Sequence, residues 1–93
     1  MKRLIEYKKN GYSFTLVKRL GDNAIFRGTR TDHGETSQSY EVIMIQSHNG
    51  LNIHGNESPA AEYRPSDSQW GSKAWTYQTI EKAQEKFDEI NAL

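Results

Sequence analysis

The chain has 93 residues, 34% of them hydrophobic, with 12 basic and 12 acidic side chains and no cysteine. This length provides one small hydrophobic core, and the composition excludes a disulfide framework and a cysteine nucleophile. The longest apolar run, residues 42–45, is far shorter than a membrane span. We therefore predict one cytoplasmic domain over residues 1–93, with no membrane contact.

The two parts of the chain differ in charge. Residues 1–30 hold eight basic and two acidic side chains, whereas residues 31–93 hold four basic and ten acidic ones. Such segregation favours an interaction surface of one sign. Packing of the two parts against each other would instead neutralise the charge internally.

The first residues predict a β-hairpin. Asn10-Gly11 separates two β-prone runs, residues 3–9 and 12–20. This dipeptide is the strongest short hairpin signal, because both central positions of the tight turn need positive φ. In the second run Tyr12, Phe14 and Leu16 recur at every second position, which is the period of a strand.

Further strands are expected up to residue 54. Gly21-Asp22 supplies a turn before a third strand at residues 23–30, and a polar loop covers residues 31–36. Residues 39–46 are apolar on both faces, which is typical of a central strand covered on both sides. A short fifth strand at residues 51–54 completes the antiparallel sheet that we predict for residues 1–54.

Residues 55–78 are expected to form a long aromatic-containing loop. Proline, glycine and serine interrupt every apolar pattern from residue 55 to residue 74. A loop of this length in a small domain is usually either functional or mobile. Because it carries Tyr63 and Trp70, we expect it to be pinned to the rest of the domain.

Residues 79–92 predict the one helix. Thr79 is a good N-cap, and Glu81 in the first turn is favourable to the helix dipole. Apolar side chains recur at helical spacing at Ile80, Ala83, Phe87 and Ile90. The fold class that we predict is α+β, an antiparallel meander of four to five strands with this helix packed on one face.

Three large aromatic residues, Trp70, Trp75 and Tyr77, precede the helix within eight residues. Large rings are valuable to a thin core, so Trp75 and Tyr77 are expected to close it where the chain enters the helix. The same residue types are enriched in binding surfaces, so all three, together with Tyr63, are also candidate protein-binding residues. Trp70, between a polar run and a glycine, is the better candidate for exposure.

Residues 40–88 carry a resemblance. The segments YEVIMIQ, EYRPSDSQWG and AWTYQTIEKAQEKF occur in that order. This half of the chain resembles small uncharacterised proteins of phages and bacterial mobile elements, which share a Tyr-Glu-Val strand, a Pro-Ser-x-x-x-Trp-Gly loop and a Trp-Thr-Tyr-x-Thr helix entry. The resemblance implies an accessory protein that acts on host machinery, and it implies no catalytic residues.

Catalytic and metal-binding patterns are weak. His48, His54 and Glu57 could supply metal ligands, but structural zinc sites use tighter spacing and four ligands, often with cysteine. Asp32-His33 with a serine would need a triad geometry that adjacent residues do not favour. The chain contains no phosphate-binding loop and no zinc-protease motif. We predict no enzymatic activity, no metal site and no cofactor.

Two functions follow as hypotheses. The first is a small non-enzymatic binding module, a phage-type accessory protein that docks on a host protein. The alternative is a nucleic-acid-binding domain that uses the basic N-terminal hairpin and the next strand, with the candidate contacts Lys8, Lys9, Lys18, Arg19, Arg27 and Arg30. Homodimerisation is compatible with both.

Overall fold

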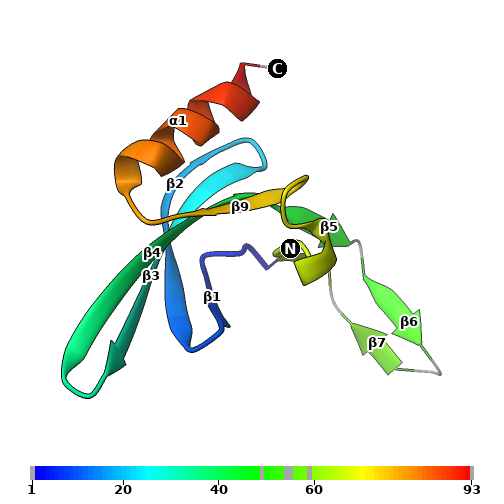
Figure 1. Cartoon of the computed structure of the whole chain (residues 1–93). Coiled ribbons are helices and arrows are strands. Elements are labelled where there is room, and N and C mark those ends of the chain that lie inside the picture. Colours follow the sequence, from blue (N-terminus) through cyan, green and yellow to red (C-terminus); the bar gives the residue numbers. More distant parts are fainter. Residues whose placement is uncertain (1, 49, 54–55, 59, 93) are drawn as a thin grey trace.

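The computed structural model describes residues 2–48, 50–53, 56–58 and 60–92. Its centre is a five-stranded antiparallel sheet with the helix α1 (Ile80–Asn91) lying across one face (Figure 1). The predicted α+β class is therefore confirmed. The strand order is β1 (Glu6–Lys9), β2 (Tyr12–Leu20), β3 (Asn23–Asp32), β4 (Glu35–Met44) and β9 (Ala74–Tyr77).

Three tight turns shape the meander, at residues 10–11, 21–22 and 33–34. Asn10 and Gly11 have φ values of 54° and 83°, and Lys9 pairs with Tyr12, so the predicted first hairpin is confirmed. The prediction of a polar loop over residues 31–36 is wrong. β3 continues to Asp32 and β4 begins at Glu35, so only His33 and Gly34 form the turn. The end of the β3–β4 hairpin is exposed on both faces and so lacks the apolar alternation that marks a strand.

The fifth strand of the sheet is not the predicted one. β6 (Leu51–Ile53) pairs with β7 (Asn56–Ser58) in a separate ribbon that projects away from the sheet (Figure 1). His54, the last residue of the predicted strand, lies outside the described residues. β9 takes the expected place instead, pairing with β4 from Tyr40 to Ile43.

The segment 55–78 has more regular structure than the predicted loop. Besides β7 and β9 it contains β8 (Ala61–Tyr63), which pairs with β5 (Gln46–His48), and a 3₁₀ turn at Asp67–Gln69. Each of these elements is only three or four residues long, too short to show a period in the sequence. Residues 55 and 59 lie outside the described part of the chain.

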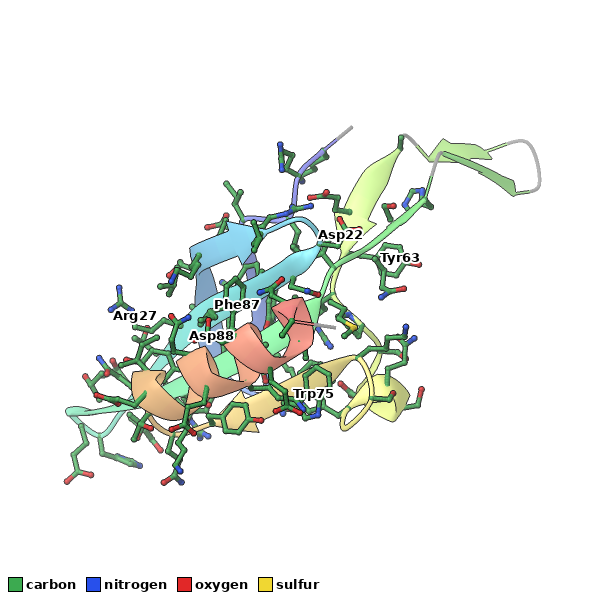
Figure 2. All side chains as sticks on the ribbon, turned by 90° about the horizontal axis from the view of Figure 1, so that it is seen from above. Asp22, Arg27, Tyr63, Trp75, Phe87 and Asp88 are labelled. Atoms are coloured by element: carbon green, nitrogen blue, oxygen red, sulfur yellow. The ribbon has the colours of Figure 1, made fainter. Side chains whose placement is uncertain are left out.

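The helix closes one face of the sheet (Figure 2). Thr79 is the N-cap, and its hydroxyl accepts a hydrogen bond from the Lys82 N–H at 3.3 Å. The buried helical residues pack with two strand residues in one apolar cluster, which consists of Ile25, Val42, Ala83, Phe87 and Ile90. The predicted N-cap and apolar stripe are therefore confirmed.

A second cluster fills the opposite face and consists of Phe14, Ala24, Phe26, Ile43, Ile45 and Ala74. Val42 and Ile43 point into different clusters, so β4 is covered on both sides as predicted. Gly28 is needed here, because a Cβ at that position would lie 2.4 Å from the Phe14 ring. Among the described residues, no helix is long and apolar enough to cross a membrane.

Candidate functional site

The four predicted aromatic residues do not form one surface. Trp75 and Tyr77 lie on the helix-covered face and pack against its apolar cluster. Trp70 packs against the cluster on the opposite face. Tyr63 is 44% exposed and lies at the end of β8, with its ring 5.9 Å from that of His48.

Trp75 and Tyr77 occupy structural positions. They alternate with Ala74 and Thr76 along β9, so both point toward the helix. The Lys86 ammonium lies 4.4 Å from the centre of the Trp75 ring, which is a cation–π contact between the helix and β9. Of the two sequence interpretations, core closure describes these residues better than an open binding surface.

A polar network stands at the centre of the opposite face. Glu41 is 1% exposed and accepts hydrogen bonds from the Tyr7 hydroxyl at 2.5 Å and from the Lys9 ammonium at 2.6 Å. The Thr76 hydroxyl donates to the same carboxylate at 3.2 Å and accepts from the Trp70 indole N–H at 2.9 Å. One carboxylate thus joins β1, β4 and β9.

Burial raises the pKa of the Tyr7 hydroxyl well above its usual value, and its hydrogen bond to Glu41 raises it further. Tyr7 therefore remains a neutral hydrogen-bond donor. Its ring stacks on Phe14 and tilts against Phe26, with both pairs of ring centres 4.9 Å apart. The network is saturated by internal partners, which describes a structural tie rather than a reactive carboxylate.

Trp70 is shielded by cations. The Lys9 ammonium lies 3.7 Å from the centre of its ring, and the Arg64 guanidinium lies 6.0 Å away. The same guanidinium is 5.7 Å from the centre of the Tyr7 ring. Trp70 is thus partly buried, as Trp75 and Tyr77 also are, and it is held by contacts on several sides.

Glu62 forms a second polar tie. Arg19 donates to both of its carboxylate oxygens at 2.7 Å, and the Leu4 N–H donates to one of them at 2.9 Å. The hydrogen bonds from Arg19 are the main reason that the pKa of Glu62 is lowered from 4.5 to about 2. This contact fastens the N-terminal segment and β8 to the end of β2.

The six predicted nucleic-acid contacts are dispersed. Lys9 and Arg19 point inward to Glu41 and Glu62, and Lys18 donates to Gln84 of the helix at 3.1 Å. The other three are exposed at separate places along the sheet, namely Lys8 on β1 and both Arg27 and Arg30 on β3. The structure therefore does not bring the six together on one basic face.

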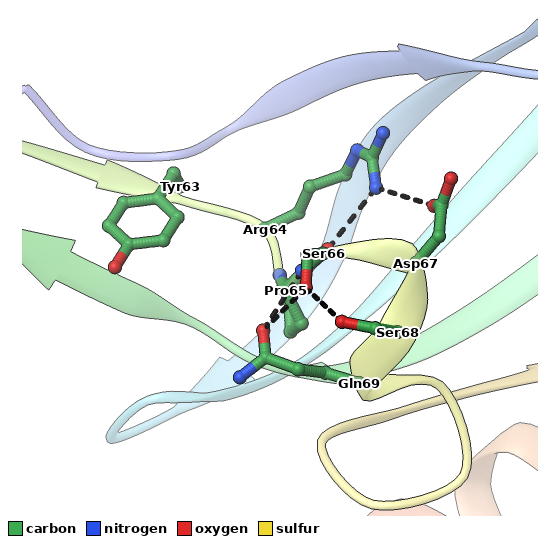
Figure 3. Close-up of a pocket in the computed structure, with 7 residues that line it drawn as sticks. All are labelled: Tyr63, Arg64, Pro65, Ser66, Asp67, Ser68 and Gln69. Carbon is green, nitrogen blue, oxygen red and sulfur yellow. Dashed lines mark hydrogen bonds and ion pairs between the residues drawn. The ribbon is translucent and has the colours of Figure 1, made fainter.

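An open hollow of about 770 Å³ lies beside the 3₁₀ turn and is lined by residues 63–69 (Figure 3). Arg64 is its cation, and its guanidinium donates to the Pro65 carbonyl at 3.2 Å and to the Asp67 carboxylate at 3.4 Å. Because Asp67 compensates the charge, the hollow has no excess positive charge with which to bind an anion.

The free edge of β2 is the surface that the sequence did not indicate. β1 pairs with residues 12–15, and the last contact along this edge is the Leu16 N–H donating to the Ile5 carbonyl at 2.9 Å. The chain before Ile5 turns away to β8, where Glu62 N–H donates to the Lys2 carbonyl at 2.9 Å. In the described residues, β2 therefore has no second strand partner beyond Leu16.

Exposed apolar side chains mark this same edge. Ile5 is 60% exposed, Val17 44% and Leu20 61%, and with Tyr63 they are the large exposed hydrophobic residues of the described chain. Val17 and Leu20 belong to the end of β2, and Ile5 adjoins it through the backbone contact of its carbonyl with Leu16. We define these three residues, with the side of residues 17–20 that faces away from β3, as the β2 edge.

Within the described residues, no group of three or more histidine, aspartate or glutamate side chains could hold a metal ion. His54 of the weak metal candidate lies outside the described residues. No family model, curated protein or solved structure matches the chain.

Proposed function

We propose that this chain is a non-enzymatic binding module that docks on another protein by adding a strand of that protein to the β2 edge. The observation that carries the proposal is the coincidence of an unpaired strand edge with exposed Ile5, Val17 and Leu20. In strand addition the backbone supplies affinity and the flanking side chains supply specificity. The added strand would run antiparallel to β2 and continue the line of β1.

The other edges of the sheet offer less for docking. β9 is covered at Ala74, whose carbonyl accepts from the Gly71 N–H at 2.7 Å. β1 exposes charged Glu6 and Lys8 and contains no aliphatic residue that could pack on an added strand. Among β1, β2 and β9 of the five-stranded sheet, β2 is the strand that combines free backbone groups with exposed aliphatic side chains.

A binding role also fits the state of the ionisable groups. Glu41, the one charged residue that is buried in the described chain, has its oxygens occupied by Tyr7, Lys9 and Thr76. A general acid or base needs access to a substrate proton, and this carboxylate has none. We therefore assign no catalytic role to the network.

The resemblance to phage and mobile-element proteins supports the identity of the partner class. An accessory protein of that kind acts on host machinery, so the proposed partner is a host protein in the bacterial cytoplasm. An edge of four residues buries little surface, and interfaces of small area are typical of weak or transient complexes.

The test is capture from a bacterial lysate with matched surface variants. The wild-type chain and Leu20→Lys would be compared with Thr31→Lys, an exposed position on the distant β3–β4 hairpin. We expect one partner to be retained by the wild type and by Thr31→Lys, and to be lost with Leu20→Lys because a charge replaces an apolar contact. A photo-crosslinking residue at Val17 should label that same partner.

Circular dichroism and thermal unfolding would first show that all variants fold alike. Equal capture by Leu20→Lys and the wild type would overturn the proposal. So would a crosslink that forms only from positions on the helix or on the distant hairpin.

A further inference from the structure

The β2 edge carries two adjacent cations, Lys18 and Arg19, which differ in whether a carboxylate pairs with them. Arg19 is neutralised, because Glu62 and Asp22 both pair with its guanidinium, at 2.7 Å and 3.2 Å. Lys18 has no carboxylate within ion-pair distance among the described side chains. Its ammonium donates to the neutral Gln84 side chain at 3.1 Å and lies 5.6 Å from the Phe87 ring centre.

The helix side chain that binds the Lys18 ammonium, Gln84, is neutral and leaves its charge uncompensated. Gln84 uses its amide nitrogen to donate to Asp88 at 2.8 Å, so Gln84 stands between Lys18 and that carboxylate. Lys18 is exposed and is flanked along β2 by exposed Val17 and Leu20. The edge therefore presents one uncompensated cation, Lys18, with Val17 directly before it and Leu20 two residues after it, beyond the neutralised Arg19.

The same pattern disfavours a second copy of this chain as the occupant. An antiparallel self-pairing centred on Lys18 places the uncompensated Lys18 ammonium groups of the two copies opposite each other. Like charges directly opposite each other on a sheet are destabilising.

We propose that the partner segment is an extended apolar strand with a carboxylate at its centre, placed opposite Lys18, and with apolar residues that meet Val17 and Leu20. This inference rests on the proposed function, since it names the chemistry of the strand that the β2 edge receives. A cation that repels a second copy and attracts an acidic strand provides discrimination as well as affinity.

The test uses a displayed library of random short peptides selected separately on the wild-type chain and on Lys18→Glu. We expect the wild type to select peptides with Asp or Glu between apolar residues, and Lys18→Glu to select Lys or Arg at that position. A peptide from the first selection should bind Lys18→Glu about tenfold more weakly, because an attractive pair becomes a repulsive one. Replacing the central acid of that peptide by Lys should restore binding to Lys18→Glu.

The outcomes separate this inference from the proposed function. Selected peptides that shift the backbone amide NMR signals of residues 17–20 but lack a central acid would overturn the inference and keep the docking edge. Peptides that shift signals elsewhere, or no selection above that on Leu20→Lys, would overturn both. A wild-type dimer in sedimentation that dissociates on Leu20→Lys would make a second copy the occupant and overturn the inference.

Discussion

The two faces of the sheet are closed by different kinds of interaction. On the helix face, Phe87 and Ile90 pack on Ile25 and Val42, and the cluster consists of apolar side chains. On the opposite face an apolar cluster surrounds the carboxylate of Glu41, which binds side chains from both edge strands. The helix face is held together mainly by the burial of apolar side chains. The opposite face combines apolar burial with a network of directional hydrogen bonds around Glu41.

The difference affects what each face can tolerate. Hydrophobic packing is non-directional, so the helix face should lose stability in proportion to the apolar volume removed. A buried polar network is costly when it is only partly satisfied, because the remaining charged groups lose their partners. On the opposite face, the loss of stability should therefore depend on whether both partners of a polar contact are replaced, as well as on the volume removed.

The largest effect is expected from Phe87→Ala on the helix face. Phe87 is 4% exposed, so its truncation leaves a cavity between the helix and the sheet and should lower the free energy of unfolding by about 4 kcal/mol. Urea unfolding followed by circular dichroism measures this loss.

Glu85→Ala is the matched control, because Glu85 is an exposed residue of the same helix. Its effect should stay within about 0.5 kcal/mol. If the two variants unfolded at the same urea concentration, the helix would not be a stabilising layer of this domain.

The next largest effect concerns the opposite face. Glu41→Leu leaves the Lys9 ammonium and the Tyr7 hydroxyl without their acceptor and should cost about 3 kcal/mol. Adding Lys9→Met removes the orphaned charge and should recover about 1–2 kcal/mol. A double-mutant cycle in urea measures this coupling.

Additive losses in that cycle would contradict a coupled polar network. That outcome would reduce the difference between the two faces to their packing.

The sequence predicted the helix face well for a physical reason. The stripe at Ile80, Ala83, Phe87 and Ile90 and the cap at Thr79 are local patterns, readable within one helix. The Asn10-Gly11 turn is equally local, because the conformation of two residues sets the hairpin. Such features need no knowledge of distant contacts.

The opposite face depends on contacts between residues far apart in the chain. Tyr7 and Lys9 are more than 30 residues from Glu41, as the sequence separations of 34 and 32 show. One signal was present, since Glu41 shares strand parity with buried Ile43 and so places a charge on an apolar face. No sequence pattern indicates the free β2 edge, because this edge depends on where the segment before β1 turns away from β2.

A smaller effect is expected from the tie at Glu62, which fastens the N-terminal segment. A carboxyl group whose pKa is lowered in the folded chain contributes stability above its unfolded pKa and loses it as the pH falls through the folded value. With a pKa lowered from 4.5 to about 2, the contribution of Glu62 should be complete above pH 4.5 and disappear toward pH 2.

The measurement is the free energy of unfolding of wild type and Glu62→Gln across that pH range. The two should differ most at neutral pH and converge on acidification, whereas Glu85→Gln should follow the wild type throughout. A difference that stays constant from neutral pH to pH 2 would mean that Arg19 does not stabilise the ionised form of Glu62.

The smallest effect is expected for nucleic acid. Because the polar ties hold Lys9 and Arg19 inside and the exposed cations are spread along the sheet, mixed DNA and RNA oligonucleotides should give a flat fluorescence-anisotropy titration at low salt. Lys8→Glu should leave that titration unchanged. Binding that weakens steeply with salt and on Lys8→Glu would show that the exposed cations suffice for phosphate contacts. The alternative function would then replace docking on a protein, even though the inward-facing pairs remain as the structure has them.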